Sequence, residues 1–207
     1  MRPSRVSAAD RLLARPLSYR LWQTPFAEAK FAPVLRHNDL ARVRRVLDVG
    51  CGPGTNAHHF AGVDYLGIDV NERYVEYARR RHNRDFVVVD ATEFTVPAGE
   101  RFDFVLVNSF LHHIPDGAAR RLLAHLSSVL TNEGHIHVIE LELPEHPSVA
   151  RLLARMDRGD HPRPLKAWRE LLAESFEPVV FEPYRLGGSG WAGVTLWNMV
   201  YFKGRAR

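Results

Sequence analysis

The segment from Val46 to Thr55 constrains the fold of this chain more than any other. It is an apolar run that leads into a loop with glycine at every second position, at Gly50, Gly52 and Gly54. Glycine has no Cβ, so such a loop can turn sharply and let a ligand lie against its main-chain N–H groups. The segment therefore predicts a strand that opens onto a ligand-binding loop.

Two acidic residues accompany this loop. Asp48 lies within the first apolar run, and Asp69 ends a second one, Tyr65–Asp69. A carboxylate at the end of that second strand can accept hydrogen bonds from ribose hydroxyls. A nicotinamide site more often has the spacing Gly-x-Gly-x-x-Gly, whereas here Gly54 comes one residue too early and Asp48 replaces an apolar residue. The pattern therefore disfavours a nicotinamide cofactor.

The motif from Asp48 to Gly54, with the acid at Asp69, resembles the cofactor loop of the class I S-adenosylmethionine-dependent methyltransferases. The motif pattern is similar to that of the small ubiquinone and menaquinone methyltransferases. The resemblance spans about residues 41–203, and its sequence-specific part is residues 46–116. It implies S-adenosyl-L-methionine as cofactor, S-adenosyl-L-homocysteine as product and methyl transfer as the reaction.

The resemblance also implies roles for residues at the carboxyl ends of the expected strands, where ligands bind in open parallel sheets. The backbone near Gly50 and Gly52 would face the methionine moiety, and Asp48 would hold either the loop or the cationic amino group. Asp69 would accept hydrogen bonds from the ribose hydroxyls, and Asp90 from the adenine amino group. The implied cofactor residues are Asp48, Gly50, Cys51, Gly52, Gly54, Asp69, Val70, Asp90, Ala91 and Asn108.

The segment from Asn108 to Asp116 carries the catalytic candidates, His112 and His113. Histidine titrates near neutral pH, so one of the pair can take a proton from a hydroxyl that attacks the methyl group. The alternative is that the pair only shapes the loop, with the rate supplied by alignment of the reacting groups. The Asn-Pro-Pro-Tyr motif of relatives that methylate amines and amides is absent, which favours oxygen as the acceptor, with carbon as the next choice.

Beyond Arg45 the chain alternates short apolar strands with helical segments, which predicts a mainly parallel sheet covered on both faces. The link at 187–190 is too short for a crossover, so the last two strands must pair antiparallel. With the resemblance, this predicts an α/β Rossmann-like sheet of seven strands in the order 3-2-1-4-5-7-6. The expected strands are 45–50, 65–69, 86–90, 102–109, 135–143, 179–186 and 194–203, and the expected helices are 56–60, 72–81, 117–130, 148–156 and 165–175.

Residues 1–40 are expected to form an N-terminal helical cap, and residues 41–207 the methyltransferase domain. One or two amphipathic helices are expected between residues 7 and 40, broken near Pro16 and Pro25. In similar methyltransferases such helices form a lid over the substrate, and the alternative is that they only cover the sheet.

Substrate contacts are expected from the lid and from the end of the fifth strand. Tyr19 and Trp22 are the candidates in the lid. Glu140 and Glu142 lie two apart and therefore point to the same face, where Glu140 is the candidate for a polar or cationic substrate. The alternative is that both are solvated strand ends. In the connection that follows, the candidates for contact with an acidic acceptor, or for plain surface residues, are Arg151, Arg155, Arg158 and Arg163.

Composition limits the remaining classes of function. The 207 residues, 45% of them apolar, suit one soluble domain without a membrane span, and we expect it in the cytoplasm as a monomer or homodimer. The net charge of +4 permits an anionic partner, but the arginine run at 79–84 is expected to end a helix rather than to bind nucleic acid. The single cysteine, Cys51, excludes an internal disulfide and a cysteine-based zinc site, and no metal is expected.

The sequence thus predicts an enzyme that methylates a small molecule. The competing classes are a cofactor-binding protein that has lost methyl transfer and a methyltransferase acting on RNA or protein. Cofactor turnover would separate the first class from an enzyme, and salt-sensitive RNA binding would support the second.

Overall fold

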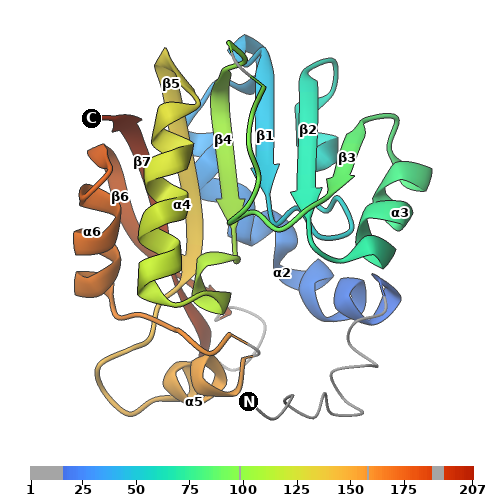
Figure 1. The fold of residues 1–207 in the computed structure, drawn as a ribbon. Coiled ribbons are helices and arrows are strands. Elements are labelled where there is room, and N and C mark those ends of the chain that lie inside the picture. Colours follow the sequence, from blue (N-terminus) through green and yellow to red (C-terminus); the bar gives the residue numbers. More distant parts are fainter. Residues whose placement is uncertain (1–15, 98, 158, 188–193) are drawn as a thin grey trace, which may run out of the picture.

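The structure is a computed structural model that describes residues 16–97, 99–157, 159–187 and 194–207, with side chains from residue 26 onward. Seven strands form one sheet in the order β3-β2-β1-β4-β5-β7-β6 (Figure 1). This order is the one predicted from the sequence. The strands are β1 (Arg45–Val49), β2 (Asp64–Asp69), β3 (Asp85–Val88), β4 (Phe102–Asn108), β5 (Leu130–Leu141), β6 (Phe176–Gly187) and β7 (Thr195–Ala206).

The five strands from β3 to β5 pair parallel, and β7 pairs antiparallel with both β5 and β6. The closing hairpin expected from the short link is therefore confirmed. The carboxyl ends of β1, β2 and β4 share the lower edge of the sheet in Figure 1. Chain order reverses between β1 and β4, and such a reversal is where open α/β sheets bind ligands.

Strand β5 begins earlier than predicted. The sequence suggested a helix as far as Leu130 and a strand only from His135, but Leu130 already pairs with Phe102 of β4. Gly134 allows the close approach, since a Cβ there would lie 2.8 Å from the carbonyl oxygen of Phe102. Gly134 thus serves close strand pairing.

Helices cover both faces of the sheet. Leu123 of α4 and Trp168 of α6 pack with Leu47 on the face turned to the viewer in Figure 1. Phe31 of α2 and Val75 of α3 pack on the other face. The described helices are α2 (Pro16–His37), α3 (Glu72–Arg81), α4 (Asp116–Ser128), α5 (Val149–Met156) and α6 (Leu165–Ala173), with the 3₁₀ helices η1 (Leu40–Arg42), η2 (Ala57–Phe60) and η3 (Leu111–His113).

The predicted break near Pro25 is wrong, because α2 is continuous from Pro16 to His37. Pro16 occupies the first helical position, where the missing N–H needs no partner. Pro25 lies in the helix interior, where it costs one hydrogen bond. Further along, Phe31 and Val34 are 1% and 0% exposed, so burial of this helix against the sheet outweighs that local cost.

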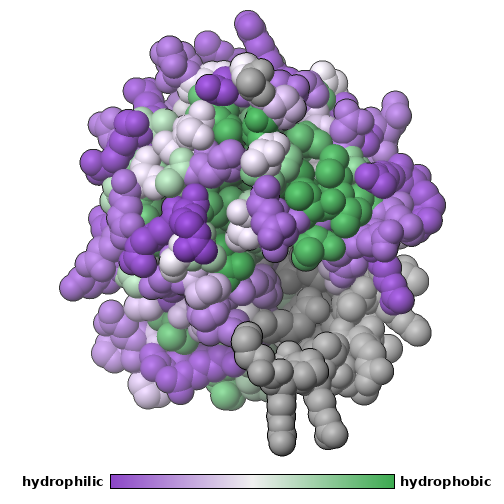
Figure 2. Space-filling model, in the orientation of Figure 1, coloured by the Kyte–Doolittle hydropathy of each residue, from purple (hydrophilic) through white to green (hydrophobic). Residues whose placement is uncertain are grey.

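One part of the front face carries no helix. The described part of the connection between β3 and β4 contains none, and Figure 2 shows apolar surface over this area. Val87 is 40% exposed there and pairs in register with Ile68 of β2. In the part of the chain with a described structure, no helix is long and apolar enough to cross a membrane.

Candidate functional site

A cavity of about 440 Å³ opens at the carboxyl edge of the sheet. It brings together residues from the glycine loop, the end of β2, the end of β3 and the loop after β4, which are far apart in sequence. Seven of the predicted site residues line it. The lining residues are Gly50, Gly52, Asp69, Val70, Asn71, Tyr74, Val89, Asp90, Ala91, Ser109, Phe110, His113 and Ile114.

The glycine loop adopts a conformation that other residues rarely take. Gly50, Gly52 and Gly54 have φ angles of 69°, 54° and 77°. A Cβ at Gly50 would lie 2.7 Å from the ring of Phe110, and one at Gly54 would lie 3.0 Å from the ring of His82. Gly50 and Gly52 therefore keep the cavity wall free of side chains, whereas Gly54 lets the loop pack against the end of α3.

Asp69 ties this loop to strand β2. Its Oδ2 accepts a hydrogen bond from the Gly52 N–H at 2.8 Å, and its Oδ1 accepts one from the Asn71 N–H at 2.8 Å. Burial raises the pKa of this carboxyl, while the two N–H groups act against that shift. Each carboxylate oxygen keeps a second lone pair, and the residue lines the cavity, so Asp69 fits a partner that offers two hydroxyl donors.

Asp90, Ala91 and Val70 form another part of the cavity wall. The Oδ1 of Asp90 accepts hydrogen bonds from the backbone N–H and the hydroxyl of Thr92, at 2.8 and 2.7 Å. Val70 is 69% exposed, so it offers a flat apolar surface to a ligand. An apolar surface beside a carboxylate acceptor suits a planar base that carries an amino group.

Asp48 lies beneath the loop and does not line the cavity. Its Oδ2 accepts hydrogen bonds from the Tyr65 hydroxyl at 2.6 Å and from Asn56 Nδ2 at 3.3 Å. Burial raises the pKa of Asp48 to about 6. Its Oδ1 is buried without a hydrogen-bond partner, which leaves an acceptor for a cationic amino group or a bridging water. Of the two roles left open for Asp48, these bonds support that of holding the loop.

A smaller cavity of about 20 Å³ lies beside the large one, and Cys51 and Asn108 line it together with Gly50. Lys30 of α2 also lines it and donates a hydrogen bond to the hydroxyl of Ser109 at 3.0 Å. Burial lowers the pKa of this amine to about 8. Sequence reasoning chose the aromatic residues of this helix and missed Lys30, although a lysine in an apolar helical stretch was a usable signal.

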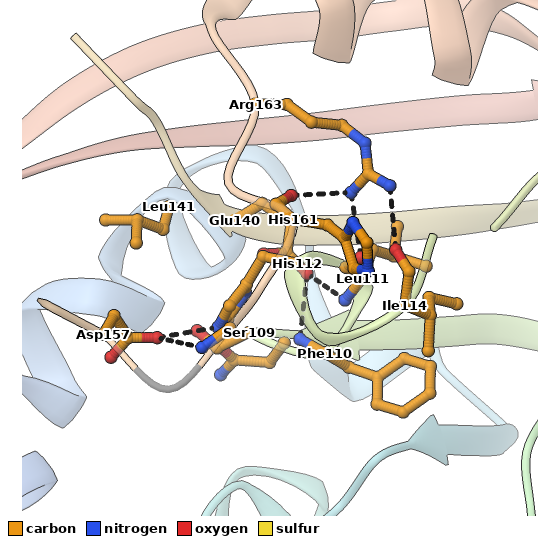
Figure 3. A network of polar contacts seen from close by, with 12 residues as sticks. Ser109, Phe110, Leu111, His112, Ile114, Glu140, Leu141, Asp157, His161 and Arg163 are labelled. Atoms are coloured by element: carbon orange, nitrogen blue, oxygen red, sulfur yellow. Dashed lines mark hydrogen bonds and ion pairs between the residues drawn. The ribbon is translucent and has the colours of Figure 1, made fainter. Parts of the chain in front are cut away.

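His112 and Glu140 form the centre of a buried polar network (Figure 3). His112 Nδ1 lies 2.6 Å from Glu140 Oε2, and Nε2 lies 3.1 Å from Asp157 Oδ2. Glu140 Oε1 also accepts from the N–H groups of Phe110 and Leu111, at 2.9 and 2.6 Å. The two carboxylates overcome burial and raise the pKa of His112 to about 9.

This network argues against two predictions. A general base needs a free lone pair, and both ring nitrogens of His112 face carboxylates that hold the ring protonated. Glu140 is fully buried, so it positions the loop after β4 rather than meeting a substrate. Sequence periodicity placed Glu140 on the correct strand but could not show that backbone N–H groups use its acceptors.

Arg163 supports the same loop from the other side. Its guanidinium donates to the carbonyl groups of Leu111 and Ile114, each at 2.9 Å, and pairs with Asp116 at 2.7 Å. The side chain lies over the ring of Trp168, and the residue is 5% exposed. The alternative that Arg163 is a plain surface residue is therefore wrong, and its contact with an acidic acceptor stays a prediction.

His113 differs from its neighbour because it lines the large cavity and is exposed. It is thus the histidine of the pair that can reach a bound ligand. Tyr19 and Trp22 belong to α2 by their backbone, but their side chains lie outside the described residues.

Among the described residues, two groups of three have donor atoms within 4.8 Å of one another and could hold a metal ion. Sequence reasoning weighed only His135 and His137 and expected no metal. His137 is fully buried, stacks on Phe104 at 3.7 Å and bonds to the Tyr201 hydroxyl at 3.0 Å. The two groups are Glu28, His58 and His59, and His112, His113 and Asp157.

Comparison with known proteins agrees with this geometry. Residues 46–134 match the family model of the methyltransferase domain. Over 134 residues the chain is 31% identical to ubiquinone biosynthesis O-methyltransferase of Thiobacillus denitrificans, with 56% of each chain covered. Over 192 residues it is 26% identical to trans-aconitate 2-methyltransferase of Delftia acidovorans, with 82% of this chain and 67% of that one covered.

A solved structure supports the same fold. Human N-acetylserotonin methyltransferase matches with a TM-score of 0.70 at 20% identity, covering 97% of this chain and 56% of that one. These matches support assignment to the class I S-adenosylmethionine-dependent methyltransferase family, with residues 46–134 matching its domain model. S-adenosyl-L-methionine is the cofactor of this family. The chain spans about half to two thirds of the length of the curated relatives it matches.

Proposed function

We propose that this protein transfers a methyl group from S-adenosyl-L-methionine to an oxygen atom of a small molecule. The observation that carries the proposal is the 440 Å³ cavity, because the open glycine loop, Asp69 and His113 all line it. The relatives named O-methyltransferases support oxygen as the acceptor.

The chain's own residues fit each part of the cofactor. Asp69 would accept from the ribose hydroxyls, and Asp90 with Val70 would hold the adenine. The bare backbone of Gly50 and Gly52, whose N–H groups bond to Ile68 and Asp69, would face the methionine moiety. When bound, the cofactor supplies a sulfonium methyl group that is already activated for transfer. The protein then has to exclude water and align the acceptor with that methyl group.

Lys30 would lie at the methionine end of this site. Its ammonium borders the small cavity beside Gly50 and Asn108, where a carboxylate group would find a positive partner. Because Lys30 belongs to α2, this contact supports residues 1–40 as a cap that completes the site. Tyr19 and Trp22 remain proposed substrate contacts of the same cap.

His113 is the proposed general base. An imidazole on the cavity wall can take the hydroxyl proton of an acceptor as its oxygen attacks the methyl group. His112 would act as a positioning residue, because its bonds to Glu140 and Asp157 fix the loop that carries His113.

Calorimetric titration of the purified chain with S-adenosylmethionine and S-adenosylhomocysteine tests the cofactor, with NADH as the control ligand. Micromolar binding of the first two alone supports the proposal.

Incubation with methyl-labelled cofactor and matched panels of hydroxyl, amine and carbon acceptors then tests the reaction. Label in hydroxyl acceptors supports O-methylation, label only in amines overturns that part, and cofactor binding without transfer to any panel, RNA or protein extract indicates a binding protein.

A further inference from the structure

We propose that Glu28, His58 and His59 form a binding site for one divalent transition-metal ion, with Zn²⁺ as its simplest occupant. The site lies outside the large cavity and joins helix α2 to the 3₁₀ helix η2 that follows the glycine loop. Two imidazoles and one carboxylate are a ligand set that suits Zn²⁺ and its first-row neighbours, with the remaining coordination positions open to water.

The donor atoms converge at distances that suit one ion. His58 Nε2 lies 3.3 Å from Glu28 Oε1, and His59 Nε2 lies 4.0 Å from the same oxygen. Two ligands about 2.0–2.1 Å from an ion with tetrahedral angles lie roughly 3.3 Å apart. The His58–Glu28 separation already matches that value, and a shift of less than about 1 Å would bring His59 to it.

A hydrogen bond holds His58 in the tautomer that leaves Nε2 able to bind a metal ion. Its Nδ1 lies 2.9 Å from the carbonyl oxygen of Thr55, which can only accept, so Nδ1 carries the proton. In the neutral ring Nε2 then holds a lone pair that faces the Glu28 carboxylate. Two acceptors 3.3 Å apart require a cation or a second ring proton between them. Orientation of a ligating histidine by a backbone carbonyl is the usual arrangement around a metal.

His59 is held in place by its neighbours. Its ring stacks on Phe31 of α2 with centroids 4.1 Å apart and planes 3° from parallel. Its side chain is 11% exposed, whereas His58 and Glu28 are 53% and 70% exposed. One ligand is therefore rigid, and the other two can close around an ion that arrives from solvent.

A bound ion would fasten α2 to the glycine loop. Glu28 lies two residues before Lys30 on α2, and His58 lies three residues after Thr55, where the loop ends. The ion would therefore fix the segment of the cap that borders the small cavity. This effect concerns the cap's attachment and is separate from methyl transfer.

The test is calorimetric titration of the untagged full chain with ZnCl₂ in a buffer that does not chelate zinc. We expect one site whose affinity falls at least about tenfold in Glu28→Gln, His58→Gln and His59→Gln. His146→Gln is the matched control, since His146 is an exposed histidine outside the group, and its affinity should equal that of the wild type. Amide exchange in residues 26–37 should slow with zinc in the wild type but not in His58→Gln.

Three outcomes would overturn the site. Equal zinc binding by the wild type and the His58→Gln/His59→Gln double variant would show that the group is only an ion pair. A loss of zinc affinity in His146→Gln as large as that in the three ligand variants would show non-specific binding to surface histidines. Loss of the site in His113→Gln but not in His58→Gln would assign the metal to the other group. None of these results depends on whether S-adenosylmethionine binds.

Discussion

The imidazole of His112 lies 2.6 Å from the carboxylate of Glu140, with side chains 4% and 0% exposed. This pair joins the end of β5 to the loop after β4, where Glu140 also binds two backbone N–H groups. Because His113 follows directly in that loop, the buried pair sets where the cavity-lining histidine points. The sequence motif gave no reason to distinguish His112 from His113. In the structure His112 supports the loop, and of the two histidines only His113 lines the cavity.

Glu140→Gln should lower the free energy of unfolding by about 3 kcal/mol, because it leaves a buried imidazolium with only one carboxylate partner. Glu142→Gln is the matched control, two residues along the same chain segment. Glu142 is half-buried and burial raises its pKa, so loss of its charge should change stability by less than about 0.5 kcal/mol. Urea unfolding of both variants measures the difference, and equal stabilities would contradict the role given to Glu140.

The same network predicts how stability depends on pH. The pKa of His112 rises from 6.5 to about 9 on folding, so its contribution is complete below pH 6.5 and is lost as the pH rises towards 9. Between pH 6.5 and pH 8 the loss should be about 1–2 kcal/mol. Glu140 and Asp157 have lowered pKa values and stay ionised throughout that range. Lys30, with a pKa of about 8, is about half protonated at that limit, so its titration must be cancelled by comparison with a variant that keeps it.

Urea midpoints at pH 6.5 and pH 8 provide the measurement, with His112→Gln as the comparison. His59, His82, His135 and His137 have lowered pKa values and titrate alike in both proteins, so only the difference between the two reports on His112. The stability that the wild type has over the variant should fall between pH 6.5 and pH 8. A difference that stays constant or grows would show that His112 is not held protonated in the folded protein.

The sequence predicted the sheet well because its signals are local. Short apolar strands alternate with helical segments, and the short link before β7 forces an antiparallel hairpin. The order of the seven strands came from the family resemblance of the glycine loop. The continuous helix α2 was missed because the local cost of Pro25 is outweighed by burial of Phe31 and Val34, which only the folded sheet provides.

The candidate site was predicted in part for a similar reason. Asp69 and Asp90 could be placed because they end strands whose carboxyl ends share one edge. The roles of His112 and Glu140 depend on a contact between residues 28 positions apart, and Lys30 reaches Ser109 across 79 positions. No local pattern records such pairings. Periodicity tells which face of a strand or helix a residue occupies, but not which group its side chain bonds to.

Asp69→Asn should weaken binding of S-adenosylhomocysteine about tenfold to a hundredfold, because a charged acceptor for the ribose hydroxyls contributes about 1.5–3 kcal/mol. Asparagine keeps one acceptor oxygen, so one of the two bonds from the Gly52 and Asn71 N–H groups can persist and hold the loop. Asp64→Asn is the control at the start of the same strand, where the side chain is 59% exposed. Titration calorimetry compares the two, and an Asp69→Asn affinity equal to that of Asp64→Asn would remove the ribose assignment.

His113→Ala should lower turnover about a hundredfold to ten-thousandfold, the usual contribution of a general base, while cofactor affinity changes less than about threefold. The two measurements must be made on the same preparation, with an acceptor identified in the labelled-methyl screen. His112→Gln provides the contrast, because loss of the ring that joins Glu140 to Asp157 should lower thermal stability and turnover together. If His113→Ala loses affinity and turnover to the same degree, His113 contacts the cofactor and alignment alone supplies the rate.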